Sequence, residues 1–214
     1  MHDHVALAFD LAFKYRNPAM ILADGAIGQM MEKVVLAPQR PRKTDEEIAA
    51  ECKEWATPGK GDREHGNTIT SLELKSEVME VINHRLQAKY KAMEENEVRF
   101  EMFDCDDADY VIVAFGSSAR ICSATVELAR AEGIKLGLLR PITLYPFPTK
   151  PIVELAKRGV KGFMSVELNA GQMVEDVKLA VNGMAPVEHY GRQGGMMFTP
   201  DEVLNALKKQ LINK

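Results

Sequence analysis

Polar side chains and glycines recur in four loops, each of which follows an apolar, strand-like run. The candidate ligand or interface residues in these loops are Gly116, Ser117, Ser118, Arg140, Glu167, Asn169, Gln172 and Arg192. In an open sheet of parallel strands, ligands bind outside the carboxyl ends of the strands. We therefore expect these side chains to gather at one edge of a sheet, where they could hold an anion or face another subunit.

The first loop, Gly116-Ser117-Ser118, would present two hydroxyls and backbone N–H groups at a helix N-terminus. Such a terminus attracts phosphate or carboxylate. The loop is not a dinucleotide fingerprint, because the second and third glycines of that motif are absent. This weakens the prediction of a nicotinamide-binding, Rossmann-like protein. The simpler alternative is a tight strand-to-helix turn in which serine caps the helix.

The second and third loops differ in what they offer. Residues 140–148 contain three prolines, which fix φ and remove backbone donors, so we expect a rigid aromatic interface anchor with a Tyr145-Pro146 bond that could be cis. Residues 167–172 carry a carboxylate and two amides. Those groups could orient a polar ligand or bond across a subunit interface, or they could simply cap a helix. Both interpretations stay open.

The fourth loop places Arg192 on a glycine-flanked turn, residues 191–195. A guanidinium can grip carboxylate or phosphate with two parallel hydrogen bonds, which makes Arg192 the best anion-binding candidate. The alternative is an ion pair with a neighbouring carboxylate of the same domain. His189 is interpreted as structural, because no motif places a serine or cysteine nucleophile beside it.

Strand-like runs alternate with helical patterns after residue 109, which predicts an α/β fold with a mostly parallel sheet covered by helices on both faces. Thr199 is the expected cap of the last helix. The predicted strands are 110–115, 135–139, 162–166 and 187–190, and the predicted helices are 118–132, 150–158, 171–181 and 200–211.

The first half of the chain is less regular. It predicts a helix over 5–15, a buried strand over 19–23, a short helix between 44 and 55, and a long amphipathic helix over 72–95. We expect residues 1–37 to be the end of a first domain, 38–105 a connector and 106–214 a second domain. A partial first domain would expose apolar surface, so self-association is expected.

Composition excludes several classes. The net charge of −4, with scattered lysine and arginine, gives no reason to expect nucleic acid, and no apolar run is long enough for a membrane span. The start lacks a secretory pattern, so a cytoplasmic protein is predicted. Cys52, Cys105 and Cys122 are far apart and form no recognisable zinc, iron–sulfur or disulfide motif, which predicts plain buried or half-buried thiols.

Six stretches, in order, resemble one enzyme family, the α subunits of 2-oxoacid:ferredoxin oxidoreductases, especially the 2-oxoisovalerate and 2-oxoglutarate branches. The resemblance covers nearly the whole chain and is to the C-terminal portion of that subunit, from the end of the pyrimidine-binding domain to a transketolase-C-like domain II. The stretches are 8–29, 64–67, 110–116, 140–148, 166–172 and 190–196.

The resemblance implies a multisubunit enzyme that decarboxylates a 2-oxoacid on thiamine diphosphate, reduces ferredoxin and forms an acyl-CoA. In the family a β subunit holds the diphosphate and magnesium, and the iron–sulfur clusters lie on other subunits or domains. The implied partners are β, γ and ferredoxin-like δ subunits, ferredoxin, CoA and the 2-oxoacid. This chain is then expected to brace the active site and subunit interfaces, to bind no cofactor or metal itself and to be inactive alone.

Two alternatives accompany the resemblance. The same fold could serve as a non-catalytic assembly or regulatory module. Asp24, at the end of an apolar run, is a conceivable magnesium ligand, although an aspartate followed by glycine is more often a turn.

Overall fold

The computed structural model describes residues 1–213 and divides the chain into two compact units. Unit 1 is formed by residues 1–21 and 32–89. Unit 2 is formed by residues 22–31 and the described residues from 90 onward. The short segment 22–31 therefore belongs to unit 2, although unit 1 flanks it on both sides along the chain. The three-part division expected from the sequence stays a prediction.

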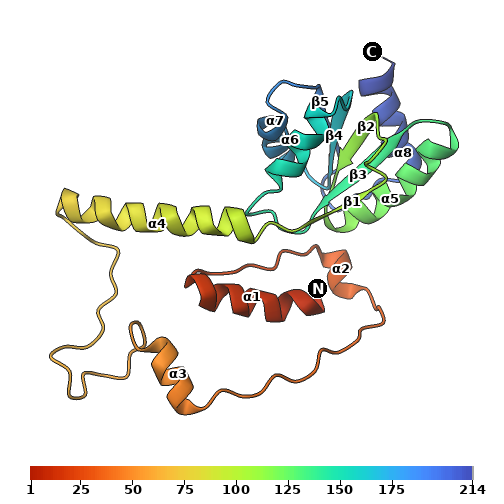
Figure 1. The fold of residues 1–214 in the computed structure, drawn as a ribbon. Helices are drawn as coiled ribbons and strands as arrows, with labels where there is room; N and C mark the ends of the chain where they lie inside the picture. The colour runs from red at the N-terminus through yellow and green to blue at the C-terminus, as the bar shows by residue number, and fades with distance from the viewer. Residues whose placement is uncertain (214) are drawn as a thin grey trace. The chain divides into compact units, whose positions relative to one another are not determined.

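Unit 2 is built on a five-stranded sheet with the order β1-β3-β2-β4-β5 (Figure 1). Strands β2 to β5 run parallel, and β1 pairs antiparallel with β3 at one edge. The predicted α/β fold with a mostly parallel sheet is thus confirmed. The strands are β1 Phe100–Phe103, β2 Tyr110–Val113, β3 Leu136–Pro141, β4 Gly162–Glu167 and β5 Val187–Gly191.

Helices cover both faces of this sheet: α5 and α8 pack on one face, and α6 and α7 on the other (Figure 1). Successive side chains of a strand point to opposite faces, so Ile112 joins the core under α5 and α8 while Val111 and Val113 join the core under α6 and α7. All three are fully buried. The helices are α5 Gly116–Ala131, α6 Thr149–Lys157, α7 Met173–Val181 and α8 Pro200–Leu207, followed by a π-helical turn, η1 Lys208–Ile212.

Unit 1 contains α1 His2–Tyr15, α3 Asp45–Cys52 and most of α4 Ser76–Asn96, as the helical patterns predict. Helix α3 begins with a capping box, in which the Thr44 hydroxyl accepts the backbone N–H of Glu47 and the Glu47 carboxylate accepts that of Thr44. In residues 1–213 no helix is long and apolar enough to cross a membrane.

The predicted strand over residues 19–23 is wrong. These residues form no regular structure, and the Met20 side chain is 86% exposed. An apolar run becomes a strand only when neighbouring strands satisfy its backbone groups, and no strand of the described residues pairs with it. The chain continues instead into a short helix of unit 2, α2 Gly25–Gln29, with Asp24 as its N-cap.

Candidate functional site

The four loops named from the sequence lie at one edge of the sheet of unit 2. They follow β2, β3, β4 and β5, and because these strands are parallel, their carboxyl ends share that edge. The topology therefore brings the candidate residues to the same side of the domain, as predicted. Whether these residues bind a ligand or another subunit stays a prediction. The hydrogen bonds and ion pairs that they make within unit 2 are described loop by loop below.

At the first loop, an internal carboxylate lies at the start of α5. The Ser117 hydroxyl donates a hydrogen bond of 2.7 Å to one oxygen of Asp24, and the Ile27 N–H donates one of 2.8 Å to the other. These bonds, the one from Ser117 first, hold the pKa of Asp24 below its usual value. Ser118 is buried. Asp24 thus acts as the N-cap of the short helix α2 and as the acceptor for Ser117 at the start of α5.

At the second loop, Arg140 pairs with Glu101 across the antiparallel edge of the sheet. The two residues are register partners of β3 and β1, and Arg140 Nη1 lies 3.0 Å from Glu101 Oε2. Their side chains are 40% and 45% exposed, so the pair contributes little stability, about 0–1 kcal/mol. The Tyr145-Pro146 peptide bond is cis, and Tyr145 is exposed.

At the third loop, Glu167 is buried and bonded entirely inside the domain. Its carboxylate accepts backbone N–H groups of Gln172 at 3.1 Å, Met173 at 2.9 Å and Val174 at 3.0 Å, and the Ser165 hydroxyl at 2.9 Å. The side chain therefore caps the N-terminus of α7, where backbone N–H groups lack helical partners.

The electrostatics of Glu167 follow from these bonds. Burial alone would raise the pKa of Glu167, but the hydrogen bonds, led by those from the Met173 N–H and the Ser165 hydroxyl, outweigh it, and the pKa lies below its usual value. Asn169 makes a local turn, in which its side-chain oxygen accepts the Gly171 N–H at 2.7 Å. Of the two interpretations of this loop, the bonding supports helix capping.

The third and fourth loops pack tightly against each other. A Cβ on Gly191 would lie 2.4 Å from the Asn169 carbonyl oxygen and 2.8 Å from that of Glu167, so only glycine fits there. His189 Nε2 is buried, lies 3.8 Å from a Glu167 oxygen and has no hydrogen-bond partner within residues 1–213. Its burial keeps Nε2 from an outside ligand, in keeping with a structural histidine.

Arg192 pairs with a carboxylate of its own domain. Its Nη1 lies 2.9 Å from Glu202 Oε1. Glu202 is also the capping-box residue of α8, where its other oxygen accepts the Thr199 N–H at 2.7 Å. Of the two roles considered for Arg192, the contact is the ion pair with a neighbouring carboxylate of the same domain. An anionic ligand would have to compete with Glu202 for the guanidinium.

The described residues do not suit the diphosphate–magnesium group that the resemblance implies for the complete enzyme. Residues 1–213 contain no group of three or more histidine, cysteine, aspartate or glutamate side chains placed to hold a metal ion. The carboxylates at the sheet edge, Asp24, Glu167 and Glu202, are engaged by donors of unit 2. We derive no chemical step through that group from these side chains.

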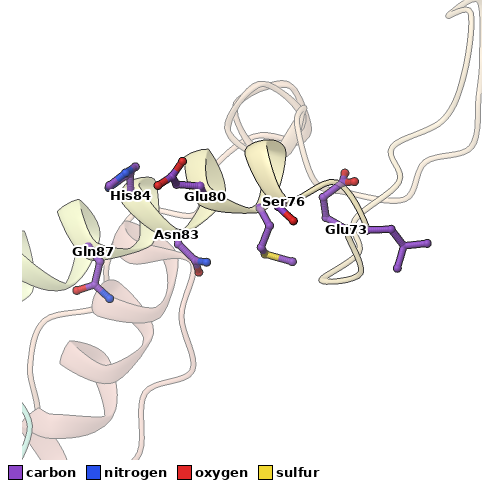
Figure 2. Close-up of a pocket in the computed structure, with 8 residues that line it drawn as sticks. Glu73, Ser76, Glu80, Asn83, His84 and Gln87 are labelled. Carbon is purple, nitrogen blue, oxygen red and sulfur yellow. The ribbon is translucent and has the colours of Figure 1, made fainter.

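A separate shallow depression of about 460 Å³ lies along α4 in unit 1. Polar side chains follow one another along the helix there, including Ser76, Glu80, Asn83 and Gln87 (Figure 2). We did not predict it from the sequence, although the spacing of these residues was a usable signal. Most of these side chains are exposed, and all of them come from α4 and the irregular segment directly before it, so they form no enclosed site.

Comparisons with known proteins identify the family. Residues 108–203, which run from before β2 into α8, match the family described as pyruvate:ferredoxin oxidoreductase core domain II. The chain is 44% identical to ketoisovalerate oxidoreductase subunit VorB of Methanothermobacter marburgensis, over 98% of this chain and 57% of VorB. This chain belongs to the family of 2-oxoacid oxidoreductase subunits.

A further relative and a solved structure from the 2-oxoacid oxidoreductases also match this chain. The 2-oxoglutarate synthase subunit KorA of the same organism is 31% identical over 96% of this chain and 60% of KorA. The chain thus spans less than two thirds of the length of these relatives. A solved 2-oxoglutarate:ferredoxin oxidoreductase from Magnetococcus marinus, with 2-oxoglutarate, coenzyme A and succinyl-CoA bound, shares the fold with a TM-score of 0.60 at 21% identity, over 72% of this chain and 28% of that one.

Proposed function

We propose that this chain is part of the α subunit of a thiamine-diphosphate-dependent 2-oxoacid:ferredoxin oxidoreductase. The reaction is the oxidative decarboxylation of a 2-oxoacid to an acyl-CoA with reduction of ferredoxin. The observation that carries the proposal is the 44% identity to VorB over 98% of the chain. Identity to KorA is lower, 31%, which favours a branched-chain substrate such as 2-oxoisovalerate over 2-oxoglutarate.

In this proposal the chain supplies support rather than chemistry. Thiamine diphosphate and magnesium are held in the complete complex, and iron–sulfur clusters are carried by other subunits. The partners are β, γ and ferredoxin-like δ subunits, and the location is the cytoplasm. The internal bonding of Ser117, Glu167 and Arg192 supports this division of labour, because each fixes a loop at the sheet edge and leaves the loop surface to contact a neighbour.

The test is a chimera in which this chain replaces the matching stretch of Methanothermobacter VorB, produced with the other subunits of that enzyme. We expect it to assemble and to reduce viologen in a reaction that needs both CoA and 2-oxoisovalerate. A complex made with the unmodified VorB is the positive control, and omission of CoA is the negative control. An assembled complex without activity would contradict the enzyme-subunit proposal.

The second candidate function is a non-catalytic assembly or regulatory module. The internal bonding of the sheet edge favours this candidate, because the carboxylates there already accept hydrogen bonds or ion pairs from residues of unit 2. The chimera separates the two candidates: assembly with no activity toward 2-oxoisovalerate, 2-oxoglutarate or pyruvate supports the module.

A further inference from the structure

Unit 1 contains a cleft of about 350 Å³ between the end of α1 and the turn that follows α3. Two of its walls are the aromatic rings of Phe13 and Trp55, whose centroids lie 6.1 Å apart and whose planes are inclined by 57°. Small-molecule sites have volumes of roughly 300–1,000 Å³ and combine apolar or aromatic walls with a few polar groups. The proposed function gives this cleft no role. Its lining residues are Ala12, Phe13, Arg16, Asn17, Pro18 and Trp55.

Hydrogen bonds on both sides of Trp55 hold this residue in place. The Asn67 side-chain amide donates to the carbonyl oxygen of Lys53 at 2.9 Å and to that of Ala56 at 2.8 Å. Arg63 Nη1 donates in turn to the Asn67 side-chain oxygen at 2.9 Å, which fixes the amide. A ring whose backbone is already ordered loses little further freedom when a ligand packs against it.

Arg16 brings a positive charge to the cleft. It ends α1 in the left-handed conformation, with φ 47° and ψ 56°, where glycine is common because a side chain is strained. Its guanidinium carbon lies 5.5 Å from the centroid of the Trp55 ring, a cation–π contact. Within residues 1–213 no hydrogen bond or ion pair engages this guanidinium. Its five N–H donors are therefore available to a ligand.

The charges around the cleft favour an anion over a cation. None of the lining residues carries a carboxylate. Lys89 Nζ donates to the Asn17 side-chain oxygen at 3.2 Å, which places a second positive charge beside Arg16. The end of α1 contributes a partial negative charge of roughly one half. Two full positive charges outweigh it.

We infer that this cleft binds a small planar aromatic anion. The ring of the ligand packs against Phe13 and Trp55, and its anionic group accepts two parallel hydrogen bonds from the Arg16 guanidinium. Two kinds of molecule have this chemistry, an aryl carboxylate and a nucleoside monophosphate. The test distinguishes them.

The experiment uses the full chain and its own fluorescence. Trp55 is the single tryptophan of the 214 residues, so its emission reports on the cleft directly. We titrate the chain with phenylacetate and, separately, with adenosine monophosphate. We expect a saturable change in emission for at least one of them, with a Kd of about 1 mM or tighter. Isothermal titration calorimetry should give one site per chain.

Ligands without one of the two features are the first controls. 2-Phenylethanol and adenosine keep the rings but lack the charge, and they should bind at least about tenfold more weakly than their anionic counterparts. Acetate and inorganic phosphate keep a charge but lack a ring, and they should leave the emission unchanged. Binding therefore requires both features in one molecule.

Matched variants localise the contact. Arg16→Gln should weaken binding of the anionic ligand at least about tenfold. Arg85→Gln makes the same change at an exposed position of α4 and should leave the affinity unchanged. Phe13→Leu keeps an apolar wall without the ring and should weaken binding by about two- to tenfold. Far-UV circular dichroism and thermal unfolding verify that each variant keeps its helices.

Tighter binding of phenylacetate would identify the ligand class as aryl carboxylates, and tighter binding of adenosine monophosphate would identify it as nucleotides. Three outcomes would overturn the inference: no saturable change with either ligand, equal binding of the uncharged analogues, or binding that Arg16→Gln leaves intact. The readout is binding, so it is independent of the chimera. A chimera without activity would contradict the proposed function alone.

Discussion

Ser117 and Asp24, which are 93 positions apart, are joined by a hydrogen bond of 2.7 Å that fastens segment 22–31 to the start of α5. A second, longer contact joins the segment to α5, where Arg120 Nη1 lies 3.9 Å from the Met30 sulfur. Ile27 is its only half-buried residue, and the other residues of the segment are exposed. A capping carboxylate also interacts favourably with the positive end of a helix. This one bonded pair therefore largely decides whether α2 stays on unit 2.

The first prediction concerns that pair. Asp24→Ala removes both the cap of α2 and the acceptor for Ser117, and the loss of such a cap costs about 1 kcal/mol. Amides of residues 25–29 should then exchange with solvent about fivefold faster, while the unfolding temperature of unit 2 stays nearly constant. Ser117→Ala should give a smaller effect in the same residues. Unchanged exchange in both variants would contradict the assigned role of the bond.

The second prediction concerns Glu167. Glu167→Gln removes the charge that three backbone N–H groups and the Ser165 hydroxyl stabilise, and it turns an amide donor toward at least one backbone N–H group, which can only donate. We expect a loss of about 2–4 kcal/mol in the free energy of unfolding, measured in urea. Glu175→Gln, on the exposed side of α7, is the matched control and should change it by under about 0.5 kcal/mol. Equal effects in the two variants would rule out the cap.

The third prediction is a pH dependence with the same origin. The pKa of folded Glu167 lies below its ordinary value of 4.5, so its stabilising contribution is fully present above about pH 5 and is lost as the pH falls through the folded pKa. Between pH 6 and 3, wild type should lose more stability than Glu167→Gln, whose residue 167 cannot titrate. Parallel acid limbs for the two proteins would contradict the lowered pKa.

The fourth prediction tests the contact between the third and fourth loops. Gly191→Ala would place a methyl group 2.4 Å from a backbone carbonyl oxygen, which cannot move as a flexible side chain does. We expect destabilisation of at least about 1–3 kcal/mol. Gly28→Ala has no atom within 4 Å of the new Cβ and should have little effect on unit 2. The measurement is the urea midpoint of unfolding of each variant beside wild type. Equal midpoints for Gly191→Ala and wild type would contradict the close contact.

The fifth prediction concerns two thiols of unit 2. Burial raises the pKa of Cys105 to about 11, and it raises the pKa of Cys122 as well. Because the thiolate is the reactive form, both should resist a thiol reagent at pH 8 in the native protein and react rapidly once urea unfolds it. Fast native labelling of either residue would contradict its burial, which leaves 3% of Cys105 and none of Cys122 exposed.

The sequence predicted the elements of unit 2 well because local patterns determine them. Continuous apolar runs such as 111–114 are typical of strands buried on both faces, and Thr199 with Glu202 gives a clear helix start. Strand β1 was missed, although Phe100 and Met102 alternate with charged residues in the manner of an edge strand. The alternating pattern covers only four residues directly after a long helix, which is too short to distinguish a strand from a loop.

The bonding of the candidate site was harder to predict, because it depends on residues far apart in the sequence. The partner of Arg140 is Glu101 on a strand that was not predicted, and the partner of Ser117 is Asp24 from the other half of the chain. Residue type and spacing therefore correctly predicted that the polar groups lie at the carboxyl ends of the parallel strands. Which carboxylate satisfies each donor followed only from the tertiary fold.

The most direct test of the central claim is the steady-state rate of CoA-dependent viologen reduction by the purified chimera, measured beside the unmodified VorB complex. The account predicts a kcat/KM for 2-oxoisovalerate within about tenfold of that complex, which corresponds to less than about 1.4 kcal/mol of transition-state stabilisation. It also predicts a lower value for 2-oxoglutarate. A fully assembled chimera that reduces no viologen with 2-oxoisovalerate, 2-oxoglutarate or pyruvate would contradict it.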